Sequence, residues 1–118
     1  MSHIIIVDDA ATMRDLVSMA LENGGHRVEA YPDAPSALVR LTKGTPDLVI
    51  TDVNMPGMNG IDFIRAARGS GYRMPILVLT TEAGPVLRQQ ARDAGASGWL
   101  VKPVDGATLC NTVKRVLP

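Results

Sequence analysis

Residues 4–23 read IIIVDDAATMRDLVSMALEN, and this stretch decides the fold class of the chain. Its first four residues are all β-branched and apolar, which is typical of a short strand buried on both faces. Across residues 12–23 apolar side chains recur at helical spacing, and Gly24-Gly25 stops the helix. The stripe expected to face inward consists of Met13, Leu16, Val17, Ala20 and Leu21. The stretch therefore predicts a strand followed by a helix.

The same unit of strand and helix recurs along the rest of the chain. Further strands are predicted at 27–30, 48–50, 76–79 and 99–101, the first of them an edge strand because its flanks are polar. Helical patterns follow, with Asp33 and Asp105 as expected N-caps and Gly44 and Gly95 as expected stops. The inward positions of these helices are Leu38, Leu41, Ile61, Ile64, Ala67, Leu109, Val113 and Val116.

Regular alternation of strands and helices predicts an α/β fold in which helices cover both faces of a parallel sheet. The alternation alone does not fix the order of the strands. The expected order is the flavodoxin-like one, 2-1-3-4-5, in a doubly wound parallel sheet built from five βα units.

Size and composition narrow the function classes. The chain has 118 residues, the usual length of one domain, so a single domain over 1–118 without an output domain is expected. Twelve basic and twelve acidic residues cancel, which argues against a nucleic-acid binder. No apolar run approaches the roughly 18 residues of a membrane span, and no signal-peptide pattern opens the chain. A lone Cys110 excludes an internal disulfide, so a cytoplasmic protein is expected.

Polar residues stand at the carboxyl ends of the predicted strands. Asp8 and Asp9 follow the first strand, Asp52 follows the third, Thr80 ends the fourth and Lys102 follows the fifth. Ligand sites in doubly wound sheets lie beyond these ends, and the four strands would be neighbours. We therefore expect three carboxylates, a hydroxyl and an ammonium group to converge on one patch.

Electrostatics indicate what such a patch is for. Two carboxylates ~4 Å apart repel by about 4 kcal/mol at an effective dielectric constant of ~20, and Lys102 alone cannot offset three carboxylates. A hard divalent cation can, and Mg²⁺ typically combines one or two carboxylates with water and phosphate oxygens. A carboxylate left over can act as a nucleophile and form an aspartyl phosphate. The patch thus predicts phosphoryl chemistry supported by Mg²⁺.

Each of these residues also has a purely structural interpretation. Asp8 and Asp9 could cap the first helix, and Asp52 could begin a turn. Thr80 could be an ordinary strand residue, and Lys102 could be a solvated one. Chance capping does not explain their joint placement at the ends of four strands, so the functional interpretation is preferred.

Four segments carry a resemblance to a known family: IIIVDDAATMRDLV, DLVITDVNMPGMNGIDFIR, PILVLTTEAG and AGASGWLVKPVDGATL. In this order and spacing they resemble response-regulator receiver domains over the whole length of the chain. The last two are particularly similar to single-domain chemotaxis regulators of the CheY type. The resemblance implies a two-component phosphoprotein that carries 4-aspartylphosphate and acts in chemotaxis and flagellar motility.

Taken residue by residue, the resemblance implies a phosphoryl acceptor and a magnesium site. Asp52 would accept a phosphoryl group from a phosphohistidine on a histidine kinase. Asp9 and Asp52 would bind Mg²⁺ together with the backbone carbonyl of Asn54, and Asp8 would act mostly through water. The side chains of Asn54 and Glu82 would flank the hydrolytic water, which implies rapid self-dephosphorylation.

The resemblance further implies a switch. Lys102 would pair with the phosphoryl oxygens, and Thr80 would swing its hydroxyl toward them. Trp99 would then turn inward, at a position where the family more often has Tyr or Phe. The open alternative is that Trp99 is a partly exposed aromatic on an interaction surface. The output face would combine the fourth helix, the fifth strand and the fifth helix, and Lys102-Pro103 resembles the family's cis peptide.

Two functions within the family stay open. In the first, the chain is not an enzyme but a monomeric binding switch, which is controlled by phosphorylation and binds the flagellar motor switch. In the second, it is a phosphorelay shuttle or phosphate sink that exchanges phosphoryl groups with a histidine phosphotransfer domain.

Two other classes fit the sequence less well. A flavin-binding electron carrier would need a Ser/Thr/Gly-rich loop where Asp8-Asp9 stand, and these carboxylates would repel a cofactor phosphate. A metal-dependent phosphatase with an aspartyl nucleophile would carry Asp-x-Asp after the first strand, which the sequence DDAAT does not match.

Overall fold

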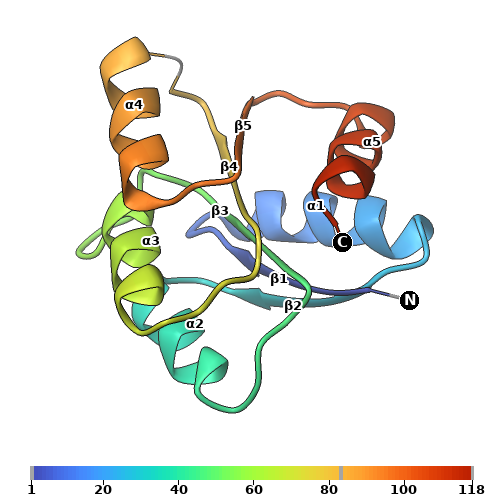
Figure 1. The fold of residues 1–118 in the computed structure, drawn as a ribbon. Coiled ribbons are helices and arrows are strands. Elements are labelled where there is room, and N and C mark those ends of the chain that lie inside the picture. Colours follow the sequence, from blue (N-terminus) through green and yellow to red (C-terminus); the bar gives the residue numbers. More distant parts are fainter. Residues whose placement is uncertain (1, 83, 118) are drawn as a thin grey trace.

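The computed structural model describes residues 2–82 and 84–117, within which five parallel strands form a single sheet. The strands are β1 (His3–Val7), β2 (Arg27–Tyr31), β3 (Leu48–Thr51), β4 (Ile76–Thr80) and β5 (Gly98–Val101). Hydrogen bonds join them in the order β2-β1-β3-β4-β5 (Figure 1). Both the parallel sheet and the predicted order 2-1-3-4-5 are thus confirmed.

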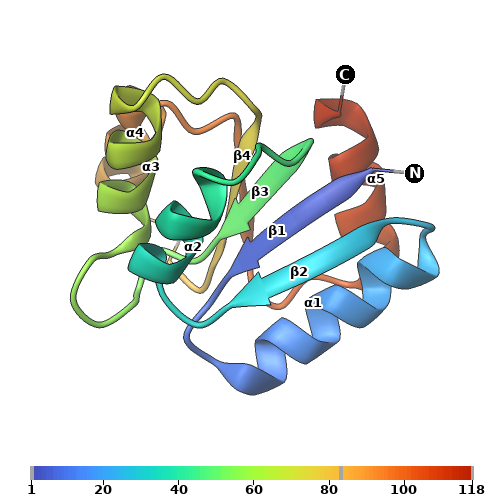
Figure 2. The ribbon, with the colours of Figure 1, turned by 90° about the horizontal axis from the view of Figure 1, so that it is seen from below.

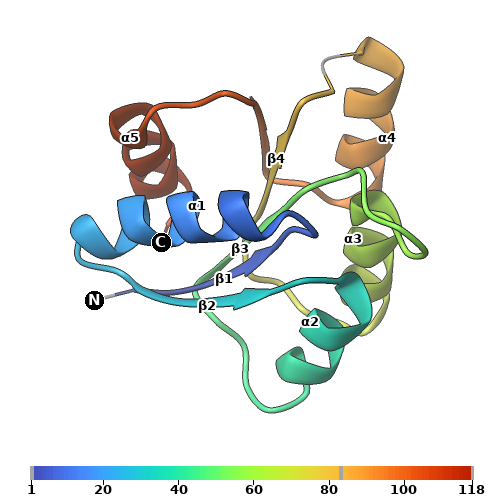
Figure 3. The same ribbon diagram turned by 180° about the vertical axis from the view of Figure 1, so that it is seen from behind.

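Helices cover both faces of this sheet. On one face, α1 (Ala11–Asn23) and α5 (Gly106–Val116) pack against each other (Figure 3). The other face carries α2 (Ala34–Leu41), α3 (Gly60–Gly69) and α4 (Pro85–Ala94), as Figure 2 shows from below. This is the expected doubly wound α/β arrangement. In the described part of the chain, every helix is too short or too polar to cross a membrane.

Local signals explain where the helices begin and end. The Asp33 carboxylate accepts a hydrogen bond from the Ser36 amide at 2.8 Å, and Asp105 accepts one from the Thr108 amide at 2.7 Å. Both aspartates are the predicted N-caps, and a cap of this kind stabilises a helix by about 1 kcal/mol. Gly95 ends α4 with φ = 114°, a left-handed conformation that glycine adopts without strain.

Two hydrophobic clusters enclose the sheet, because successive side chains of a strand point to opposite faces. Ile5, Val7 and Val78 belong to the cluster beneath α2, α3 and α4. Ile6 and Leu79 belong to the cluster beneath α1 and α5. Strands β1, β3 and β4 are buried on both faces, which explains their unbroken apolar runs. Strand β2 is only partly buried, as expected of an edge strand.

One core expectation is wrong, and the burial of Phe63 was not predicted. Leu16 was expected on the inward stripe of α1, but it is 56% exposed, and Val17 and Leu21 are the buried residues of that helix. Leu16 instead lines a shallow hollow between α1 and α5 together with Met19. Phe63 is fully buried because α3 contacts α2 on one side and α4 on the other.

Candidate functional site

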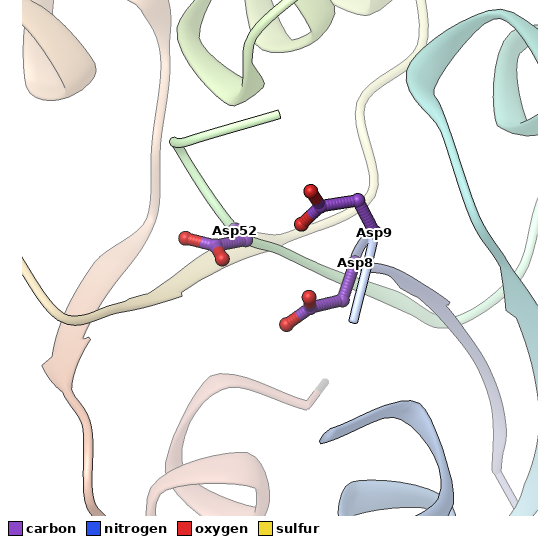
Figure 4. Close-up of side chains that lie close together, drawn as sticks. All are labelled: Asp8, Asp9 and Asp52. Carbon is purple, nitrogen blue, oxygen red and sulfur yellow. The ribbon is translucent and has the colours of Figure 1, made fainter. Parts of the chain in front are cut away.

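Three carboxylates meet at the carboxyl edge of the sheet. Figure 4 shows Asp8 and Asp9 reaching in from the end of β1 and Asp52 from the end of β3. One oxygen from each lies within 4.8 Å of the others. Asp8 and Asp52 are 3% and 8% exposed, whereas Asp9 is exposed to solvent. The sheet topology therefore brings together the three acidic residues that the sequence placed at neighbouring strand ends.

Backbone groups fix the orientation of the two buried carboxylates. Oδ1 of Asp8 accepts a hydrogen bond from the Ala10 amide at 2.9 Å. Oδ1 of Asp52 accepts one from the Val53 amide at 2.7 Å. The N-cap of α1 is Ala10, which makes no side-chain cap, so Asp8 does not cap this helix. Each carboxylate thus has one oxygen held by the backbone and a second oxygen left for other partners.

Lys102 occupies those second oxygens. Its Nζ donates to Oδ2 of Asp8 at 2.8 Å and to Oδ2 of Asp52 at 3.1 Å, and the side chain is 8% exposed. Burial disfavours the charged ammonium, but the hydrogen bonds to the two carboxylates outweigh it and raise the pKa of Lys102 above its ordinary value. The residue follows β5 directly, and its peptide bond to Pro103 is cis, as the resemblance implied.

The loops after β3 and β4 meet at the rim of the acidic pocket. The Asn54 side-chain amide donates to Oε1 of Glu82 at 3.1 Å, although the two residues are 28 positions apart. Thr80 is fully buried, and its hydroxyl oxygen accepts a hydrogen bond from the Glu82 amide at 3.3 Å. The structure therefore joins three of the candidate residues, Asn54, Thr80 and Glu82, in one short chain of contacts.

Trp99 lies apart from this chain of contacts. It stands on β5 opposite Val78 and packs, half-buried, against the hydrophobic cluster beneath α3 and α4. Its indole Nε1 is buried and has no hydrogen-bond partner in the described part of the chain. The ring also lines a hollow beside α4. These contacts place Trp99 at the boundary between the core and the surface, so both interpretations of this residue stay open.

Two further residues, Arg14 and Gly60, support the site. The Arg14 guanidinium on α1 donates to the backbone carbonyl of Asp8 at 2.7 Å; only its position one turn into the following helix could have suggested this. Gly60 starts α3, and a Cβ atom there would lie 1.9 Å from the carbonyl oxygen of Asp52. Its amide donates to the Val53 carbonyl at 2.9 Å. Glycine at this position lets α3 rest directly on the backbone of Asp52.

Comparison with known proteins agrees with this geometry. The model of the response regulator receiver domain matches residues 4–114. Chemotaxis protein CheY-3 of Vibrio cholerae is 39% identical over 116 residues, covering 96% of this chain and 89% of the relative. Chemotaxis protein CheY of Pseudomonas aeruginosa is 37% identical over 116 residues, covering 96% and 94%. The crystal structure of Vibrio cholerae CheY4 superposes with a TM-score of 0.94 at 43% identity, covering 99% of both chains. The chain therefore belongs to the response regulator receiver domains of two-component signalling and is similar to CheY-type chemotaxis proteins.

Proposed function

We propose that this receiver domain is a phosphorylation-controlled binding switch in which Asp52 accepts the phosphoryl group. The observation that carries the proposal is the position of the Asp52 carboxylate, which contacts the Lys102 ammonium and has two further carboxylates beside it. Asp52 is 8% exposed, so a small donor group can still reach it. Phosphoryl transfer depends mainly on positioning and charge neutralisation, and these residues can provide both.

The donor set also fits Mg²⁺. Hard cations prefer oxygen ligands, and the carboxylates of Asp8, Asp9 and Asp52 present oxygens within 4.8 Å of one another. Together with the backbone carbonyl of Asn54, they are the residues proposed to hold the ion. When bound, Mg²⁺ would neutralise charge on the phosphoryl oxygens and on the acidic cluster. Asp9 is exposed, so the ion could enter from solvent without a rearrangement of the fold.

The proposed transfer is a displacement at phosphorus. A carboxylate oxygen of Asp52 attacks the phosphorus atom of a phosphohistidine, forming an O–P bond while the N–P bond breaks. The bonding electrons return to the imidazole nitrogen of the kinase, and Asp52 becomes an acyl phosphate. Lys102, already hydrogen-bonded to Oδ2 of Asp52, pairs with the transferred oxygens. The phosphoryl group adds negative charge, so the Lys102 ammonium faces more negative charge after the transfer than before it.

We propose that Thr80 and Trp99 convert this charge into a change of surface. The Thr80 hydroxyl oxygen accepts a hydrogen bond from the Glu82 amide. This contact does not use the hydroxyl proton, so the proton can be donated to a phosphoryl oxygen. Donation to a phosphoryl oxygen would pull the side chain toward Asp52. The space vacated would let Trp99, half-buried next to this strand, turn inward. The output face would then be α4, β5 and α5.

The proposed partners are a histidine kinase as phosphodonor and the flagellar motor switch as target. The similarity to several chemotaxis proteins supports this choice. A role as phosphorelay shuttle or phosphate sink is the alternative, and a pull-down with motor-switch protein, with and without a phosphoryl mimic, separates the two. A cytoplasmic location and a monomeric state remain predictions.

Intact mass spectrometry after incubation with a small-molecule phosphodonor tests the proposal. We expect one labile phosphoryl adduct that requires Mg²⁺ and is missing from the Asp52→Asn variant, which keeps the shape of the side chain. An adduct that persists in Asp52→Asn would assign the acceptor to another residue. Absence of any adduct, from both a small donor and a phosphohistidine kinase, would refute phosphoryl acceptance altogether.

A further inference from the structure

A hollow between α4 and β5 lies outside the acidic pocket, and the proposed chemistry at Asp52 does not use it. Its volume is about 170 Å³, and its lining includes Arg88 and Arg92 from α4, Ser97 before β5 and Trp99 on β5. We call this feature the α4–β5 hollow. It has room for one side chain of a partner. Figure 1 shows α4 and α5 on different sides of β5.

Every polar side chain that lines the α4–β5 hollow can donate a hydrogen bond. Arg88 and Arg92 bring guanidinium groups, and Trp99 brings an indole N–H. The Ser97 oxygen accepts from the Ile76 amide at 3.1 Å, which leaves the hydroxyl proton free for a ligand. No carboxylate belongs to the lining formed by the described residues. A hollow whose polar side chains are all donors or cations favours an anionic acceptor.

The two arginines form no ion pair with any carboxylate in the described part of the chain. Among residues 2–82 and 84–117, neither Arg88 nor Arg92 forms an ion pair, and Arg92 only donates to the neutral Gln89 side chain at 3.3 Å. They stand four residues apart on α4, so their charges face the same side and repel each other. Both residues are exposed. An anion bound between them would relieve a repulsion that brings the fold no benefit.

Trp99 supplies an independent indication. Its Nε1 is buried without an acceptor, a state that is unfavourable for a hydrogen-bond donor. The ring borders the α4–β5 hollow, so an acceptor bound there is the partner that we infer for this N–H. Aromatic walls also favour the apolar stem of an acidic side chain, which would pack against the ring and Ala91.

We propose that the α4–β5 hollow binds the carboxylate of a glutamate or aspartate in an extended acidic segment of a partner protein. Arg88 and Arg92 are the specificity-determining residues, because two guanidinium groups can hold one carboxylate through paired hydrogen bonds. Trp99 provides the wall and the third donor. This inference rests on the proposed function only for the choice of the output face.

Trp99 makes the test site-specific, because it is the only tryptophan in the chain. Its indole N–H gives one cross-peak in a proton–nitrogen correlation spectrum of the full chain. The probes are the acetylated, amidated peptide Ala-Leu-Glu-Glu-Leu-Ala and the same peptide with Gln-Gln at its centre. We expect the acidic peptide to shift the indole peak to saturation and the neutral peptide to bind at least about tenfold more weakly.

A charge-matched pair of variants locates the binding. Arg88→Gln/Arg92→Gln should weaken the acidic peptide at least about tenfold, whereas Arg27→Gln/Arg65→Gln, which removes two exposed arginines elsewhere, should change affinity less than about twofold. Equal binding of both peptides, no binding of either, or equal loss in both variants would overturn the proposal. Phosphoryl uptake is measured separately on the unaltered protein. Peptide binding without uptake would leave the hollow assigned and refute the proposed function.

Discussion

Two cations lie at opposite edges of the sheet, and they are held in different ways. At the carboxyl edge, the Lys102 ammonium is bound by the carboxylates of Asp8 and Asp52. At the amino edge, the Arg68 guanidinium is bound by backbone carbonyls alone, with no carboxylate partner among the described residues. The first arrangement neutralises a charge, and the second only satisfies its hydrogen bonds.

The geometry around Arg68 is that of a cross-link. Its Nη1 donates to the carbonyls of Tyr72 and Met74 at 3.0 and 2.7 Å, and its Nη2 donates to the carbonyl of Gly95 at 2.9 Å. These carbonyls precede β4 and β5, so one side chain of α3 ties together the entries to two strands. Burial and then the nearby Arg73 lower the pKa of Arg68, in contrast to the raised pKa of Lys102.

The difference between the two cations distinguishes contacts that stabilise the fold from contacts that can take part in chemistry. Carbonyls are part of the backbone and cannot be exchanged for another ligand, so the Arg68 contacts serve structure. Carboxylates can be shared with a bound cation or transferred group, so the Lys102 contacts can be rearranged by chemistry. The following predictions test that division, beginning with the largest expected effect.

Lys102→Met should slow phosphoryl uptake at Asp52 by about 100-fold, because it removes the only described cation that contacts the acceptor carboxylate. The rate is followed by intact mass at saturating Mg²⁺. Lys114→Met, an exposed change on α5, serves as the control and should behave as the unaltered protein. Uptake by Lys102→Met within about twofold of the control would mean that Lys102 has only a structural role.

Arg68→Ala should lower the free energy of unfolding by about 2–3 kcal/mol, since it leaves carbonyls before β4 and β5 without their donors. Urea denaturation measures the loss. The control is Arg65→Ala on the same helix, where the exposed arginine faces Asp62 at 3.7 Å and should contribute less than about 1 kcal/mol. Equal losses in both variants would remove the distinction between a cross-link and a surface contact.

Added Mg²⁺ should change the stability of the Lys102 and Arg68 variants by different amounts. Lys102→Met leaves the buried carboxylates of Asp8 and Asp52 without a cation, so millimolar Mg²⁺ should stabilise this variant more than the unaltered protein. Arg68→Ala should gain no more from Mg²⁺ than the unaltered protein does. A similar gain in both variants would indicate that Mg²⁺ does not compete with Lys102 for these oxygens.

Asn54→Ala and Glu82→Ala should each change the decay rate of the phosphorylated protein by about 3- to 10-fold, an effect of about 1 kcal/mol. The two side chains are hydrogen-bonded at 3.1 Å, so loss of either frees the other at the rim of the carboxyl edge. Decay is followed by mass after removal of the phosphodonor. Unchanged decay in both variants would contradict the idea that this pair sets the lifetime.

The smallest expected effect on stability concerns Glu29, a carboxylate that pairs with Arg40 at the edge of the sheet. The pair neutralises charge, as Lys102 does, but lies outside the acidic pocket. Hydrogen bonds from Arg40 at 2.9 Å lower the pKa of Glu29 from 4.5 to about 2, although burial opposes the shift. Because the folded pKa is depressed, the stabilisation is complete above about pH 4.5 and disappears as the pH falls toward 2. With 29% of the side chain exposed, we expect about 1 kcal/mol.

Urea denaturation at several pH values checks this expectation against the variant Glu29→Gln. The stability difference between the unaltered protein and the variant should be present at pH 6 and should shrink toward zero near pH 2. A difference that stays constant over this range would show that Glu29 contributes through packing and not through its charge.

The sequence predicted the fold because its signals are local and repeated. Apolar runs fixed the buried strands, Asp33 and Asp105 marked helix starts, and strand ends predicted which acidic residues would meet. Leu16 was misplaced because helical spacing alone does not reveal how narrow a strip of α1 the sheet covers. The burial of Phe63 depends on helices on both sides of α3, which only the assembled fold supplies.

The role of Arg68 lay beyond prediction for a different reason. Its partners are backbone carbonyls up to 27 residues away, and carbonyls leave no side-chain signature in a sequence. Asn54 and Glu82 were grouped through family resemblance, and their contact joins loops 28 residues apart. Side-chain chemistry at strand ends can thus be read in advance, whereas contacts to the backbone require the folded chain.

Gly60 has a mechanical consequence for the whole molecule. Because a Cβ at this position would lie 1.9 Å from the Asp52 carbonyl oxygen, α3 and the acceptor strand are in direct contact and must move together. A backbone shift at Asp52 on phosphorylation would therefore be felt at once by the first turn of α3, outside the proposed output face.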